Sequence, residues 1–232
     1  MSDDELPVGA AVAGWTPREP PAHPSLSGTY CRLEPLEARH AASLYRAWID
    51  PAAAADWLYL PYDPPRSEAD AARWLTGLAG KDSFFAVLDP TSGNATGVAA
   101  YIRIDPSNGV TEIAHLNFTR ALMRTPAATE AIFLLLGHAF DTLGYRRVEW
   151  KCDSLNARSR SAAERYGFVF EGIFRQAVVY KGRNRDTAWY AIIDKDWPRL
   201  RAAFETWLAP QNFAPSGMQK VSLRALTRAP HD

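Results

Sequence analysis

The chain of 232 residues lacks a net charge, a cysteine-rich motif and a long apolar run. Its 26 Lys and Arg residues balance 26 Asp and Glu residues, which argues against strong binding to nucleic acid or an anionic membrane. The two cysteines, Cys31 and Cys152, fit no metal-ligand spacing, and each lies in a predicted strand. No run of about 18 apolar residues and no signal-peptide pattern is present. We therefore expect a reduced, cytoplasmic protein without a metal site or membrane span.

The length and the 47% hydrophobic content are sufficient for one domain, which would bury about 70–75% of its unfolded surface. Residues 1–27 are rich in proline with little apolar periodicity, so we expect an extended arm in which Trp15 is the side chain able to dock. The predicted domain spans residues 28–208. Residues 209–232 are predicted to form a C-terminal tail.

The first half of the domain alternates between helical and strand patterns. A strand is expected over 30–36, a helix over 37–49, and a second helix from the capping residue Ser67 to about Ala79. Three runs rich in β-branched and aromatic residues then follow between turn residues, which predicts consecutive antiparallel strands. These runs are 83–88, 97–104 and 110–118.

The next helix carries the clearest local pattern. Thr125 can cap it, Pro126 suits the first helical position, and apolar residues recur at helical spacing until Gly144. In the strand predicted over 147–152, apolar and charged residues alternate, which indicates one wetter face.

Asn156 is then expected to cap a short helix that ends at Gly167. Three late strands are predicted, with a hairpin turn over 182–185. The strands span 168–174, 176–181 and 187–194, and a terminal amphipathic helix spans 196–208.

Three motifs carry a resemblance to a known family. The stretch 124–131, the pair Asn156-x-x-Ser159 and the dipeptide Gly167-Phe168 resemble the acetyl-CoA-binding half of the GNAT N-acetyltransferases. Three further dipeptides are similar to RimL/RimJ-like members: Glu171-Gly172, Arg175-Gln176 and Asp186-Thr187.

The resemblance covers roughly residues 28–208, and its specific part is 112–198. It implies an α+β single domain, with a central mixed, mostly antiparallel sheet flanked by helices. It also implies an acyltransferase that uses acetyl-CoA as co-substrate.

The helix start near Thr125 is a natural anion site, because its unpaired N–H groups and dipole attract phosphate. The family usually writes this turn as Gln/Arg-x-x-Gly-x-Gly/Ala, whereas Pro126 and small residues stand here. Each helix start has a structural alternative to cofactor binding. The helix at Thr125 could be a capped core helix that binds no ligand, and Asn156 could cap its own helix without contacting the cofactor. The resemblance implies these cofactor-binding residues: Phe118, Arg124, Thr125, Ala127, Ala128, Thr129, Asn156 and Ser159.

Acetyl transfer from a thioester needs a neutral amine and a proton or hydrogen bond for the leaving thiolate. Many members use a tyrosine for the second role, but Ala163 stands at that position, so Ser159 is the candidate donor. Its alternative is a helix serine bonded to a backbone carbonyl. For the base, Glu112 and His115 are candidates, and a site without a dedicated base is the third option. Strand alternation places them on opposite faces, with Leu116 on the side of Glu112 and Asn117 on that of His115.

RimL-like members can also carry a carboxylate where this chain has Val178, which weakens the transfer of their mechanism. The implied acceptor is a primary amine, for example a peptide or protein N-terminus or a small molecule, attacked directly in a ternary complex. A non-catalytic acyl-CoA sensor is the competing hypothesis, and a nucleic-acid or ribosome-contacting patch in the hairpin is a weaker one. A homodimer through a late strand or the terminal helix is also open. Four aromatic residues belong either to the acceptor pocket or to the core: Trp57, Tyr59, Tyr62 and Trp74.

Overall fold

The computed structural model describes residues 8–22, 24–79 and 83–228. Within them, eight strands form one sheet in the order β1-β2-β3-β4-β5-β6-β8-β7. Every neighbouring pair is antiparallel except β5 and β6, which run parallel. The predicted fold class, a mixed and mostly antiparallel sheet flanked by helices, is therefore confirmed.

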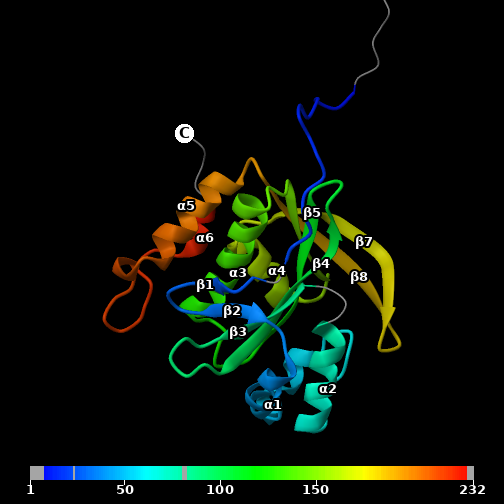
Figure 1. Cartoon of the computed structure of the whole chain (residues 1–232), viewed down its shortest axis with the longest axis vertical. Coiled ribbons are helices and arrows are strands. Elements are labelled where there is room, and N and C mark those ends of the chain that lie inside the picture. Colours follow the sequence, from blue (N-terminus) through cyan, green and yellow to red (C-terminus); the bar gives the residue numbers. More distant parts are fainter. Residues whose placement is uncertain (1–7, 23, 80–82, 229–232) are drawn as a thin grey trace, which may run out of the picture.

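The elements follow the predicted order closely. The strands are β1 (Leu26–Ser27), β2 (Arg32–Pro35), β3 (Ser83–Leu88), β4 (Ala95–Asp105), β5 (Val110–Phe118), β6 (Arg147–Asp153), β7 (Val169–Tyr180) and β8 (Arg183–Ile193). The helices are α1 (Ala41–Trp48), α2 (Glu68–Ala79), α3 (Pro126–Gly137), α4 (Ala157–Arg165), α5 (Trp197–Leu208) and α6 (Leu223–Thr227). The 3-10 turns are η1 (Ala38–His40), η2 (Pro51–Trp57) and η4 (Pro210–Asn212), and the π turn η3 (His138–Thr142) extends α3. Helices α1 and α2 lie at one end of the molecule, and α5 and α6 lie away from them (Figure 1).

Two hydrophobic clusters stabilise the sheet. The larger lies among β2–β6, β8, α3 and α5, and includes Ile113, Leu135 and Trp150. The smaller lies under α1 and α2, where Trp48 and Trp57 meet edge to face with ring centroids 5.2 Å apart. Because each cluster needs its own face of the sheet, successive residues of β3 and β4 alternate between them.

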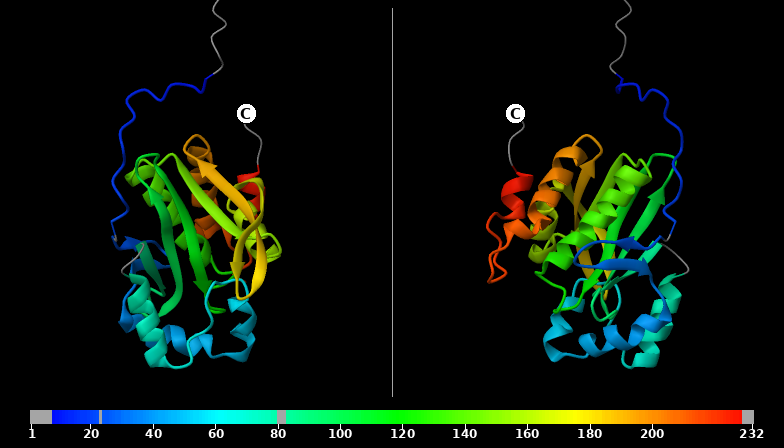
Figure 2. Two further views of the ribbon diagram at one scale, coloured as in Figure 1. Left: turned by 90° about the vertical axis from the view of Figure 1, so that its right-hand side faces the viewer. Right: turned by 60° about the vertical axis from the view of Figure 1, so that its left-hand side comes forward.

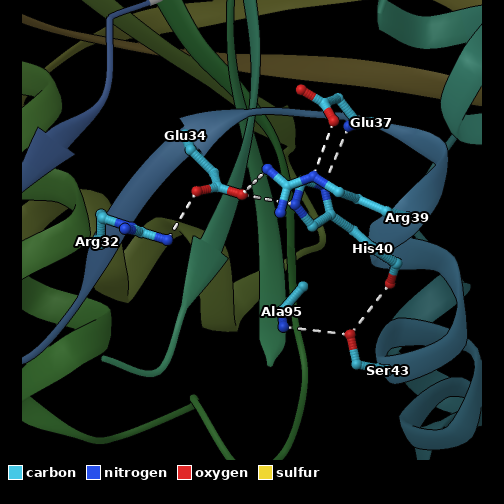
Figure 3. A network of polar contacts seen from close by, with 7 residues as sticks. All are labelled: Arg32, Glu34, Glu37, Arg39, His40, Ser43 and Ala95. Carbon is cyan, nitrogen blue, oxygen red and sulfur yellow. Dashed lines mark hydrogen bonds and ion pairs between the residues drawn. The ribbon is translucent and has the colours of Figure 1, made fainter. Parts of the chain in front are cut away.

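The junction of β2 and α1 is held by the buried carboxylate of Glu34 (Figure 3). It accepts from Arg32 (2.9 Å), lies 2.8 Å from His40 Nε2, and also meets Arg39. Burial raises the pKa of Glu34, but the His40 ring and the two guanidinium groups outweigh burial, so this pKa lies below its ordinary value. Ser43 donates to the His40 carbonyl (3.1 Å) and accepts the first N–H of β4 (3.1 Å), which ties α1 to the sheet.

The late hairpin differs from its prediction. The expected strands 168–174 and 176–181 are one strand, β7, because an irregularity near Gln176 (φ 51°) lets the pairing with β8 continue. The turn is Lys181-Gly182 rather than 182–185, and both residues have positive φ (49° and 69°), as a tight two-residue hairpin turn requires. The hairpin reaches toward the η2 end of the molecule, where Lys181 Nζ donates to the Trp57 carbonyl (3.0 Å) (Figure 2).

Both terminal segments contact the domain. Trp15 of the arm donates its indole N–H to the Ser107 carbonyl (2.9 Å). In residues 209–228, which belong to the predicted C-terminal tail, α6 packs on α5 and α4. Leu223 is fully buried, and Arg224 pairs with Glu164 (2.7 Å). Residues 1–7, 23 and 229–232 of the predicted arm and tail lie outside the described residues.

Candidate active site

Strands β5 and β6 lie side by side only where they begin. The pairing joins residues 110–112 to 147–149, and the strands then separate. A cavity of about 990 Å³ lies along this separation, with walls from β5, β6, α4, the β7–β8 hairpin and residues 55–61. The single parallel pair of the sheet therefore opens a space large enough for a small ligand.

Helix α4 presents two of the predicted site residues to this cavity. Asn156 caps the helix, since its side-chain oxygen accepts the Ser159 N–H (3.1 Å), and it also lines the cavity. The Trp150 indole N–H donates to Ser159 Oγ (2.9 Å). A hydroxyl can accept and donate at once, and Ser159 also makes a side-chain hydrogen bond with the buried Cys152 thiol, so its hydroxyl lies between Trp150 and Cys152 on the cavity wall. Trp150 was not among the predicted site residues, although its alternation with charge in the strand marks it as inward-facing.

Glu112, the predicted base, lies in a buried cluster of charges. Arg103 (2.8 Å) and Lys151 (3.1 Å) both contact its Oε2 atom. Lys151 also contacts Glu149 (2.6 Å), and its ammonium lies 3.7 Å from the centre of the Trp189 ring. The carboxylate borders the cavity while its charge is compensated by two cations.

The charged face of β6 is the less buried one, as predicted, since Arg147 and Lys151 are half-buried while Val148, Trp150 and Cys152 are buried, but the difference is small. Glu149 is 8% exposed and the Lys151 side chain 4%. Their charges can be buried because Arg147 contacts Glu149 (2.9 Å) and Lys151 bridges Glu149 and Glu112. Arg147 also donates to both oxygens of Glu171 (2.7 and 2.5 Å), which holds the pKa of that carboxyl below its ordinary value.

A β-bulge changes the direction of His115. Val98 of β4 pairs with Asn117 and Ala100 pairs with Ala114, so β5 has one more residue than β4 between these two pairs. His115 lies in this bulge and has φ 50°. The predicted grouping of His115 with Ile113 is wrong: the His115 ring stacks on Tyr62, with centroids 5.7 Å apart, on the side covered by α1 and α2. Asn117 also faces that side, where it accepts from Trp48 (2.9 Å), whereas Leu116 packs against the larger cluster. The prediction assumed that successive side chains of β5 point to opposite faces of the sheet. The extra residue of the bulge shifts this pattern by one for the residues that follow it.

The start of α3 has the predicted capping but does not line the cavity. Thr125 Oγ1 accepts the Ala128 N–H (3.3 Å), and Thr129 accepts from Arg165 (3.0 Å). Met123, one turn before the helix, does line the cavity, so the helix start borders one end of it. Three predicted cofactor residues lie on the cavity wall: Phe118, Asn156 and Ser159. Five are not part of that wall: Arg124, Thr125, Ala127, Ala128 and Thr129.

The segment that follows α1 forms another wall. Asp56 contacts Arg120 (3.3 Å) and Arg158 (3.1 Å), and the Tyr59 hydroxyl donates to the Leu155 carbonyl (3.3 Å). These contacts tie the segment to the end of β5 and the start of α4. Four aromatic residues were predicted to belong either to the acceptor pocket or to the core, and of these Tyr59 lines the cavity. The other three pack with the smaller cluster: Trp57, Tyr62 and Trp74.

Other kinds of site have less support in the described residues. Among these, no group of three His, Cys, Asp or Glu side chains is placed to hold a metal ion. Cys31 and Cys152 are both free and buried, and burial raises the pKa of each thiol. Within the same residues, no helix has the length and apolar character needed to cross a membrane.

Comparisons with known proteins agree with this geometry. Residues 31–169 match the model of the acetyltransferase (GNAT) domain. A GCN5-related N-acetyltransferase from Brucella melitensis is 46% identical, with a TM-score of 0.91 over 94% of this chain and 100% of that one. A probable GNAT-family acetyltransferase from Chromobacterium violaceum is 40% identical, with a TM-score of 0.77 over 85% of this chain and 100% of that one.

A more distant relative, the "Putative ribosomal N-acetyltransferase YdaF" of Bacillus subtilis, is 26% identical over 71% of this chain and 90% of its own length. The matched domain covers more than half of the chain and includes β5, β6 and α4, which form the cavity. The chain therefore belongs to the GNAT family of acetyltransferases and is an acyltransferase.

Proposed function

We propose that the protein transfers the acetyl group of acetyl-CoA to the α-amine of a peptide or protein N-terminus, by direct attack in a ternary complex. The observation that carries the proposal is the cavity at the β5–β6 separation, which joins Ser159 and Asn156 of α4 to Glu112 of β5. Proteins of this family generally use acetyl-CoA. The relative named as a putative ribosomal N-acetyltransferase supports a protein amine as acceptor.

The co-substrate would be held at two places. Asn156 offers polar side-chain atoms to the amides of the pantetheine arm, where the cavity passes the start of α4. The first N–H groups of α3, beside Ala127 and Thr129, offer an anion site to the pyrophosphate, and Arg124 adds a positive charge. Pro126 contributes no N–H and Thr125 already caps that of Ala128, so this site has fewer free donors than the usual glycine-rich turn.

The chemical step needs three events. The neutral amine attacks the thioester carbonyl, the carbon–sulfur bond breaks, and the sulfur gains a proton while the amine loses one. Ser159 donates its hydroxyl hydrogen toward the leaving sulfur, because the Trp150 indole already occupies one of its lone pairs. Glu112 accepts the amine proton through water at Oε1, since both of its cation contacts use Oε2.

The choice of an α-amine follows from the weakness of this base arrangement. An α-amino group with a pKa near 8 is about a tenth neutral at pH 7, whereas lysine near 10.4 is neutral roughly once in 2,500 molecules. Deprotonating the lysine amine therefore costs roughly 3 kcal/mol more free energy than deprotonating the α-amine. A carboxylate held by two cations cannot readily supply that free energy, so α-amines are favoured over lysine, and small α-amines compete with peptides as acceptors.

A homodimer is the proposed assembly. Strand β7 is the edge of the sheet and exposes apolar side chains along most of its length, among them Phe170, Phe174 and Val179. An exposed apolar edge strand tends to pair with another chain. Light scattering of the purified protein measures the mass directly, and a monomer at micromolar concentration contradicts the assembly.

The experiment that tests the function measures thioester consumption and acceptor mass together. Acetyl-CoA is supplied with peptides that offer only an α-amine, peptides that offer only a lysine amine, single amino acids and polyamines. We expect turnover with α-amines and little with lysine. Binding of acetyl-CoA without acetylation of any amine would favour the sensor over the enzyme, and absence of binding at millimolar concentration would contradict both.

A further inference from the structure

Two polar side chains of β8 lie in the cavity wall without a partner. Arg185 Nε and Thr187 Oγ1 are both shielded from solvent and form no hydrogen bond with the described residues. Both residues line the cavity, and Thr187 is only 5% exposed. Buried polar groups are nearly always hydrogen-bonded, so a pair of unmatched groups on a cavity wall indicates a ligand that matches them.

Arg185 differs from the other arginines whose Nε atoms are buried without a partner. Arg199 donates through Nη1 to the Thr227 carbonyl (2.6 Å), and Arg224 donates through Nη2 to Glu164 (2.7 Å). For Arg185, the described residues provide neither a hydrogen bond nor an ion pair; its guanidinium only approaches the Tyr180 ring, at 5.9 Å.

The charged groups around Arg185 have hydrogen-bond or ion-pair partners of their own. Lys151 is compensated by Glu112 and Glu149. Asp153, which lies opposite Thr187 in the sheet, accepts from the Leu155 N–H (2.8 Å) and the Tyr180 hydroxyl (3.0 Å). The two Asp153 partners are uncharged, so its carboxylate offsets part of the Arg185 charge from a distance, but among the described residues no carboxylate forms an ion pair with Arg185 and its Nε atom has no acceptor.

The spacing of the two groups suits one small anion. Residues 185 and 187 are two apart on a strand, so their side chains share a face, and their Cα atoms are roughly 7 Å apart. A carboxylate can accept from a guanidinium and a hydroxyl together, and such charge-assisted bonds are the strong ones. Resting on the function proposed above, we infer that Arg185 and Thr187 bind a carboxylate of the acceptor.

The acceptor would thus carry a carboxylate a few bonds from its reacting amine. Thr187 pairs with the last residue of β6, three residues before Asn156, so the subsite adjoins the place where the amine meets the thioester. Two sources offer this chemistry: an acidic side chain near a peptide N-terminus, and the α-carboxylate of a free amino acid.

The test compares acceptors that differ only in this group. Ser-Glu-Ala-amide is paired with Ser-Gln-Ala-amide, and serine with serinamide, in the wild type, Arg185→Gln, Thr187→Val and the control Arg183→Gln. Arg183 is on the same strand but exposed outside the cavity. We expect Arg185→Gln to raise KM for the acidic acceptor about ten- to hundredfold and for the amide less than about twofold, with a smaller effect of Thr187→Val and none of the control. A preference within the first pair assigns the carboxylate to a side chain, and one within the second assigns it to the α-carboxylate.

Calorimetry with CoA and the N-acetylated products repeats the comparison without turnover. If the wild type acetylates no amine, the proposed function fails, while tighter binding of the acidic products that is lost in Arg185→Gln still supports the subsite. Equal affinity of the wild type for the acidic and the amide ligands overturns the inference. It is also overturned if Arg185→Gln, with an unchanged melting temperature, loses the same affinity for both kinds of ligand.

Discussion

Glu34 of β2 and Glu112 of β5 are both buried carboxylates that meet several cations, yet their surroundings differ. Glu34 is enclosed by its network: Arg32, Arg39 and His40 surround it, and the same turn is tied to β4 through Ser43 (Figure 3). Glu112 receives both of its cation contacts on one oxygen and borders the cavity.

The difference shows how a similar set of charges can serve the fold or a site. Where every polar group meets a protein partner, the network fixes the position of a helix. Where the sheet separates beside the network, Glu112 and Ser159 line a cavity, and we propose that they act on a ligand there. Variants near Glu34 should therefore change stability, and variants around the β5–β6 cavity should change catalysis.

The largest effect is expected from Ser159→Ala. If the hydroxyl stabilises the leaving thiolate, kcat falls by roughly 10²–10³ while acetyl-CoA affinity changes little, because the interaction strengthens in the transition state. Steady-state kinetics with calorimetry measure both quantities. Ser161→Ala, an exposed serine on the same helix, is the matched control. A kcat within a factor of about three of the wild type would return Ser159 to a structural role.

Glu34→Gln should act on folding instead. The change leaves Arg32, Arg39 and His40 without their carboxylate, and we expect the free energy of unfolding to fall by about 2–3 kcal/mol, less than for a fully buried pair because both arginines are half exposed. The pKa of Glu34 is lowered by folding, so its stabilising contribution is fully present above the unfolded pKa of about 4.3 and is lost as pH falls through the lower folded value. Denaturant melts of both proteins between pH 7 and pH 2 measure this difference. A pH-independent difference contradicts the network's role.

Arg124→Glu tests the proposed pyrophosphate site at α3. Arg124 is exposed and precedes the Thr125 cap, so a carboxylate there opposes phosphate while the helix dipole tolerates it. We expect acetyl-CoA affinity to fall about tenfold with little change in melting temperature. Arg183→Glu is the control for charge reversal. The more obvious Ala128→Asp is unsuitable because Ala128 is 5% exposed and packs in the core. Unchanged affinity would place the pyrophosphate elsewhere.

Glu112→Gln should have the smallest effect on rate. The side chain keeps its shape but loses its charge, so kcat is expected to fall about three- to tenfold, with a change in the acidic limb of the pH–rate profile. A Glu149→Gln variant separates charge loss in the cluster from loss of the proton acceptor, since Glu149 also pairs with Lys151 but is not part of the cavity wall. Equal profiles for the two variants would remove Glu112 as the base and leave the two other options, His115, which also lines the cavity, and a site without a dedicated base.

Local patterns predicted most of the fold. Thr125 and Asn156 cap α3 and α4 as expected, because side-chain capping depends on residues close in sequence. The missed features depend on distant partners. The bulge at His115 is seen only against β4, and the buried charges of β6 only once Glu112 is adjacent.

The candidate site follows the same division. The motif around Asn156 and Ser159 predicted the cavity-lining part of α4, since the resemblance is carried by those residues. The Trp150 contact and the unmatched Arg185 could not be predicted, because they require the register of β6 and β8 and the separation of β5 from β6.

The most direct test is acetylation of an α-amine peptide in the wild type beside Ser159→Ala, with CoA release and product mass followed in the same reaction. We expect one CoA to be released for each N-terminal acetyl group formed, and the rate in the variant to be roughly 10²–10³ lower at saturating substrates. Binding of acetyl-CoA without acetylation of any α-amine, or equal rates in the two proteins, would contradict this expectation.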